Sequence, residues 1–203
     1  KGRENLLLQS NQFDTTWTID TSTASITSGQ ADKDGGTDAW SLVAKAVNGH
    51  HRIIQTFTGA ANSINTFSVF AKANGYNFLR IVENAITGDF ATFDLSNGSV
   101  ANTTGIANTA TIEAVGSAGW YRCSIAFDCG ATTRIDIYTM ETNGTTSFVG
   151  DGVSGAYIMN AQAESGLVAT DYIETGASTA QAGILEDMPR LDYTDSSCPS
   201  LLL

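Results

Sequence analysis

The chain has 203 residues, of which 42% are hydrophobic and only 15% are charged, and its formal net charge at pH 7 is −11. A chain of this length buries enough apolar surface to fold without a metal ion or disulfide bonds. Because 21 acidic residues outnumber 10 basic ones and no cluster of Lys or Arg offsets them, nucleic acid and an anionic membrane surface are excluded as expected partners.

Apolar and polar residues alternate in short stretches, which is the pattern of half-buried β-strands. In chain order, the predicted strands are 38–46, 51–57, 66–72, 77–83, 90–95, 109–115, 120–127, 133–140 and 156–164. Pairs such as Asn48-Gly49 and Asn143-Gly144 separate them, because Asn and Gly supply the positive φ angles of tight turns. No helical periodicity competes, so we predict an all-β fold, an antiparallel β-sandwich of the jelly-roll type.

The composition changes after the last predicted strand. Both prolines, Pro189 and Pro199, lie there, followed by a run of three leucines. We therefore predict a jelly-roll domain at 4–180 and a linker or docking tail at 181–203 that leads to a following module. Since the chain begins at Lys1 rather than at Met, it is expected to be a piece of a longer polypeptide or a processed one.

Several segments resemble a carbohydrate-binding-module-like jelly roll, of the concanavalin or laminarin type, that recurs in phage tail and other virion proteins. These segments are 4–14 with Trp17, 32–40, 66–73, 119–124, 157–164 and 170–173. The resemblance implies a non-catalytic structural or host-recognition module of the virion that binds host-surface polysaccharide. It also implies contacts with other virion proteins and, by analogy with symmetric appendages, a homo-oligomer.

Two other functions stay open beside this one. The first is a purely structural domain for capsid or tail decoration that makes subunit contacts. The second, less favoured, is an enzyme that cleaves glycans. The fold alone does not choose among them, because one architecture hosts many functions.

An acidic loop suggests a cation site. Asp32, Asp34 and Asp38 alternate around two glycines, and carboxylates arranged in this way can converge on a hard cation. Related sugar-binding jelly rolls hold a structural calcium ion where the chain ends meet, so Glu164 is expected to join these three residues. The alternative is an ordinary acidic turn whose Asp side chains cap backbone amides.

Alternation along 120–127 places Cys123, Ile125 and Phe127 in the core and turns Trp120 and Arg122 to the opposite face. Sugar rings stack on aromatic side chains while polar neighbours bind the hydroxyl groups. We therefore expect one ligand-binding face, and its members are Trp120, Arg122, Arg80, Tyr138, Gln55 and Lys72. The alternative is that Trp120 seals the edge of the sandwich and that the arginines are solvated or paired with acidic residues.

Signatures of catalysis are missing from the sequence. Retaining glycoside hydrolysis needs two carboxylates about 5 Å apart, whereas pairs such as Asp136 and Glu141 have an odd separation and face opposite ways in a strand. Adjacent His50 and His51 cannot bind one zinc ion together for the same reason. A nucleophile elbow and a phosphate-binding loop are also lacking. We therefore predict that the chain is not an enzyme.

Overall fold

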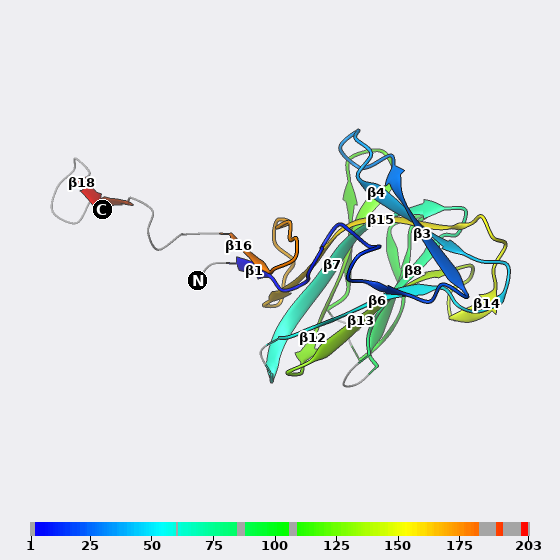
Figure 1. Cartoon of the computed structure of the whole chain (residues 1–203). Coiled ribbons are helices and arrows are strands. Elements are labelled where there is room, and N and C mark those ends of the chain that lie inside the picture. Colours follow the sequence, from blue (N-terminus) through cyan, green and yellow to red (C-terminus); the bar gives the residue numbers. More distant parts are fainter. Residues whose placement is uncertain are drawn as a thin grey trace.

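The computed structural model describes residues 3–59, 61–84, 88–105, 109–182, 190–192 and 200–202. In these residues every regular element is a β-strand, and two six-stranded sheets form a sandwich (Figure 1). The predicted all-β antiparallel sandwich is therefore confirmed. Within the same residues, no helix is long and apolar enough to cross a membrane.

The first sheet, named here the β13 sheet after a central strand, has the order β10–β9–β8–β13–β6–β2. Its strands are β2 (Thr18–Ile19), β6 (Arg52–Phe57), β8 (Phe78–Glu83), β9 (Phe90–Asp94), β10 (Ser99–Thr104) and β13 (Thr133–Met140). Strand β13 pairs with β6 on one side and β8 on the other, so Tyr138 lies directly between Arg52 and Arg80.

The second sheet, the β7 sheet, has the order β11–β12–β7–β15–β4–β3. Its strands are β3 (Ala24–Gln30), β4 (Ala39–Ala44), β7 (Ser63–Asn74), β11 (Thr111–Val115), β12 (Trp120–Cys129) and β15 (Gly155–Ser165). The register of β15 against β7 shifts between Met159 and Gln162, where Asn160 takes a φ of 52°. This bulge moves the alternation of β15 by one residue, and Glu164 therefore shares a face with Met159.

Three short strand pairs complete the fold. They are β1 (Arg3–Asn5) with β16 (Ala180–Ala182), β5 (Asn48–His50) with β14 (Ser147–Val149), and β17 (Arg190–Asp192) with β18 (Ser200–Leu202). Pairing of β1 with β16 brings the two ends of the sandwich side by side, and the β17–β18 pair lies away from the sheets (Figure 1). Much of the predicted tail at 181–203 lies outside the described residues.

The core lies between the two sheets. Phe67 and Ile125 from the β7 sheet meet Ile81, Phe93 and Ile137 from the β13 sheet, and each of these side chains is fully buried. Burial of one such side chain is worth about 1.5–3 kcal/mol, so the inner faces supply most of the stabilisation. The outer faces are left to carry the polar side chains that concern function.

Candidate functional site

The residues predicted to share one binding face lie on two different sheets. The β7 sheet carries Trp120, Arg122 and Lys72, and the β13 sheet carries Gln55, Arg80 and Tyr138. The prediction that all six line adjacent strands of one face is therefore wrong. Local alternation assigns a side chain to one of two faces, but it does not reveal which strands belong to the same sheet.

Trp120 lies on the outer face of the β7 sheet, as the alternation predicts, but its ring does not meet solvent. The side chain is 1% exposed and packs with Ala39, Phe70 and Met159 in a second apolar cluster. Stacking of a sugar on this ring would require the cluster to open. Trp120 therefore stabilises the fold in this structure.

A segment of the chain itself covers much of the face that carries Arg122. The guanidinium Nη2 of Arg122 donates to Ser68 Oγ at 3.0 Å and to the carbonyl oxygen of Thr170 at 2.5 Å. Thr170 also donates from its backbone nitrogen to Glu164 Oε1 at 2.8 Å. Hydrogen bonds from Arg122 and to Glu164 therefore hold the segment 166–175 against the sheet. Arg122 had been predicted to bind a glycan and Glu164 to bind calcium.

Gln55 and Tyr138 also differ from the expected arrangement. Gln55 points inward, is 4% exposed, and donates from Nε2 to the carbonyl oxygen of Leu8 at 2.8 Å. Its Oε1 accepts from Leu8 N at 3.1 Å, so Gln55 fixes the N-terminal segment and does not face a ligand. Tyr138 faces outward between two arginines, and burial raises the pKa of its phenol.

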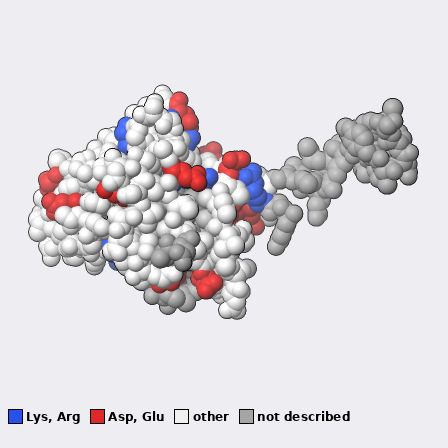
Figure 2. Space-filling model, turned by 180° about the vertical axis from the view of Figure 1, so that it is seen from behind, with Lys and Arg blue, Asp and Glu red and all other residues white. Residues whose placement is uncertain are grey.

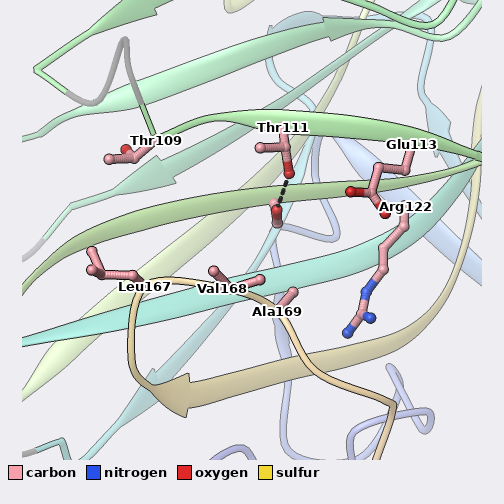
Figure 3. Close-up of a pocket in the computed structure, with 8 residues that line it drawn as sticks. Thr109, Thr111, Glu113, Arg122, Leu167, Val168 and Ala169 are labelled. Atoms are coloured by element: carbon pink, nitrogen blue, oxygen red, sulfur yellow. Dashed lines mark hydrogen bonds between the residues drawn. The ribbon is translucent and has the colours of Figure 1, made fainter.

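An open groove remains at the edge of the β7 sheet, between β11, β12 and the loop after β15 (Figure 3). A first hollow of about 90 Å³ shares Thr109 and Leu167 with a second of about 220 Å³. Residues lining the first are Thr109, Thr111, Glu113, Arg122, Ser124, Leu167, Val168 and Ala169. Together the hollows approach the lower end of the 300–1,000 Å³ that is typical of sites for small molecules.

Polar and apolar groups meet in this groove. The hydroxyl groups of Thr111 and Ser124 are 2.6 Å apart (Figure 3). Opposite them the side chains of Leu167 and Val168 are 63% and 73% exposed. A sugar ring offers both hydroxyl groups and C–H faces, so such a mixed lining suits it. The sequence does not predict this groove, because the 166–169 loop has no periodic pattern.

In this structure the acidic loop is a hydrogen-bonded turn. Asp32 Oδ1 accepts from the backbone nitrogens of Asp34 and Gly36, each at 2.8 Å, and Oδ2 accepts from Asp38 N at 3.1 Å. These bonds lower the pKa of Asp32 and leave it capping a turn. Glu164 is bonded to Thr170 instead. No group of three or more metal-binding side chains exists among the described residues, and calcium remains a prediction.

The surface agrees with the low content of basic residues. On the face shown in Figure 2, Lys and Arg emerge as small separate areas among carboxylates. A phosphate backbone binds through rows of basic side chains, and this face offers no such row among the described residues. The fold therefore adds no support for nucleic acid as a partner.

Comparison with known proteins gives structural likenesses alone. No protein-family model matches the chain, and no curated protein sequence matches it. The enzymatically active domain of tailspike protein 4 from Bacteriophage CBA120 is similar over 81% of this chain, with 16% identity and a TM-score of 0.45. The CBM22-1–GH10 modules of a Clostridium thermocellum endo-1,4-β-D-xylanase, complexed with xylohexaose, are similar over 85%, with 13% identity and a TM-score of 0.40. This chain spans 21% of the first and 29% of the second.

One prediction has to be corrected. The tailspike structure is an enzymatically active domain, and the prediction that this chain is not an enzyme does not stand. It rested on spacing within single strands, but a sheet brings together residues that are far apart in sequence, as it does with Tyr138, Arg52 and Arg80. Local spacing cannot exclude a catalytic group of that kind.

Proposed function

We propose that this chain is a carbohydrate-binding β-sandwich domain of a phage virion protein and that it binds host-surface polysaccharide. The virion setting follows from the sequence resemblance to phage modules. The observation that carries the binding function is the groove at the edge of the β7 sheet, where hydroxyl groups and Arg122 face the exposed side chains of Leu167 and Val168.

The groove has the chemistry that sugar recognition requires. Glu113 and Arg122 offer an acceptor and a donor for hydroxyl groups on one wall. Leu167 and Val168 form the other wall, and adjacent exposed apolar side chains rimmed by polar groups are typical of a binding surface. Arg122 is fixed by Ser68 and Thr170 before any ligand arrives, so little side-chain entropy is lost on binding.

The experiment uses the whole chain on an array of immobilised bacterial capsular and lipopolysaccharide glycans. Val168→Asp should abolish retention, because a buried, unpaired carboxylate opposes contact with the C–H face of a sugar. Val153→Asp is the matched control, because Val153 is also 73% exposed but lies outside the groove. Neither change should alter stability by more than about 0.5 kcal/mol, because both sites are on the surface.

Each outcome decides the proposal. Retention by the wild type and by Val153→Asp, with loss in Val168→Asp, supports it. Silence on the array, or equal retention by both variants, contradicts the groove as the site. Every glycan that is retained is then incubated with the protein and assayed for new reducing ends, which measures cleavage directly. Contacts with other virion proteins and homo-oligomer formation stay predictions.

A further inference from the structure

A second polar site lies on the outer face of the β13 sheet, away from the groove. Tyr138 of β13 pairs directly with Arg52 of β6 and with Arg80 of β8. Directly opposed side chains in antiparallel strands have Cβ atoms about 4.5–5.5 Å apart. The sheet therefore holds one phenol between two guanidinium groups in a single row across three strands.

This row carries excess positive charge. Asp136, two residues before Tyr138, is 0% exposed and accepts from Arg52 Nη1 at 2.7 Å. Arg134 donates to both oxygens of the same carboxylate, from Nε and from Nη2, each at 2.7 Å. Arg52 Nη1 also donates to the Tyr138 hydroxyl. Two guanidinium groups, those of Arg52 and Arg134, thus share one carboxylate, in a chain whose net charge is −11.

Arg80 is the member of the row without a carboxylate. It is 6% exposed, its Nε donates to Thr92 Oγ1 at 2.7 Å, and its guanidinium lies 4.0 Å from the centroid of the Phe90 ring. Its Nη2 is buried and finds no hydrogen-bond acceptor, and the same holds for Nε of Arg52, among the residues that the structure describes. Burial lowers the pKa of Arg80, since the charged form loses hydration.

Buried arginine nitrogens without acceptors lower the stability of the folded protein unless a ligand supplies the acceptor. A buried donor without an acceptor destabilises the folded state, and more so when the group is charged. A ligand that accepts hydrogen bonds and brings negative charge would remove this cost. Arg52 and Arg134 keep 22% and 33% of their side chains exposed, and exposed His50 has its ring 5.8 Å from that of Tyr138. Tyr138 and Arg80 are each only 6% exposed, so a ligand would reach the row through Arg52 and would have to displace side chains to contact Arg80 Nη2.

We infer that the row Arg52–Tyr138–Arg80 is a binding site for the carboxylate group of an acidic sugar residue in a glycan. A carboxylate has two oxygens in one plane and matches the fork of a guanidinium group. The hydroxyl groups of a neutral sugar would bring no charge to offset the arginines. The inference rests on the proposed function for its ligand class but concerns the opposite sheet, so the two sites can be tested separately.

The test follows the Nε–Hε resonance of Arg80 in the whole chain, labelled with ¹⁵N-arginine. The probe is an oligogalacturonate, and its control is the same oligosaccharide after reduction of the carboxyl groups. The acidic probe should shift the Arg80 resonance and the reduced one should not. Hydrogen bonds to charged groups are worth about 1.5–3 kcal/mol, so Arg80→Met should weaken binding by about tenfold or more. Lys45→Met, which removes a cation from the end of β4, should bind like the wild type.

The outcomes separate this site from the groove. A shift of Arg80 with the acidic probe that persists in Val168→Asp supports the site, whether or not the array supports the groove. An unmoved resonance, an equal shift with the reduced probe, or undiminished binding by Arg80→Met overturns the site. If Arg80→Met does not fold, as judged by circular dichroism, the wild-type spectra decide the question by themselves.

Discussion

On the outer face of the β7 sheet, Trp120, Phe70 and Met159 form an apolar cluster beside the segment 166–175, whereas on the outer face of the β13 sheet Asp136 is surrounded by arginines. The first face resembles a second core around Trp120, and at its groove the buried Nε of Arg122 has no hydrogen-bond partner among the described residues. The second retains buried donors without acceptors among the described residues. Both faces therefore keep unmet hydrogen-bonding capacity at a proposed binding site, but only the first combines it with an apolar cluster.

The largest effect is expected from a substitution in the apolar cluster on the β7 sheet. Trp120→Ala should lower the free energy of unfolding by about 3–5 kcal/mol, because a large buried ring is replaced by a cavity. Denaturant-induced unfolding followed by circular dichroism measures the change. A loss below about 0.5 kcal/mol, as expected for a surface residue, would show that the ring is not part of a core.

A smaller effect is expected on the charged side. Asp136→Asn should lower the free energy of unfolding by about 2 kcal/mol, because Arg52 and Arg134 lose their hydrogen bonds to a buried charge. Asp34→Asn is the control, since Asp34 pairs with Lys33 at the surface and such pairs contribute about 0–1 kcal/mol. Equal losses in the two variants would contradict the special role assigned to Asp136.

The smallest effect appears only at high pH. Burial raises the pKa of Tyr172, beside the cluster of Trp120, to about 12, whereas an unfolded tyrosine titrates near pH 10. The stabilisation from this protonated phenol is therefore fully present below about pH 10 and is lost as the pH rises towards about 12. Tyr172→Phe lacks this titration, so its free energy of unfolding should fall less over that range than that of the wild type.

The unfolding measurements on Tyr172→Phe can be checked by comparing neutral pH with high pH. At neutral pH, Tyr172→Phe loses the 2.6 Å hydrogen bond between the Tyr172 and Ser10 hydroxyl groups, which should cost about 1 kcal/mol. A parallel fall of both proteins between about pH 10 and pH 12 would contradict a raised pKa for Tyr172.

Strands with strict alternation were predictable from the sequence, and those without it were not. The stretches 120–127 and 133–140 correspond to β12 and β13, because one side of each strand is apolar. Strand β10 was missed, since its Ser- and Thr-rich sequence is largely exposed on both faces. For the residues that the structure describes, helix was excluded correctly, because no segment has a 3.6-residue apolar period.

The candidate sites were less predictable, for reasons that particular residues show. The bulge at Asn160 moves Gln162 and Glu164 to the outer face, and strict alternation with Ile158 would have put them in the core. One row contains Arg52, Tyr138 and Arg80 because β13 pairs with both β6 and β8. Tyr138 lies 86 residues after Arg52 in the chain, and no local sequence pattern predicts so distant a pairing. The prediction that Arg80 and Tyr138 are neighbours is therefore correct. The prediction that they share a face with Trp120 and Arg122 is wrong, because those two residues lie in the other sheet.

Strands β1 and β16 run antiparallel, with Arg3 opposite Ala182 and Asn5 opposite Ala180. A mechanical load applied through the two ends would therefore open these pairs one after another, as a zipper opens, rather than shear them together. Peeling would stop at Asn5, whose side-chain nitrogen donates to the carbonyl oxygens of Ala161 and Ile173 while its oxygen accepts from Ala163 N. This buried amide would act as a mechanical clamp that protects the sandwich when its ends are pulled.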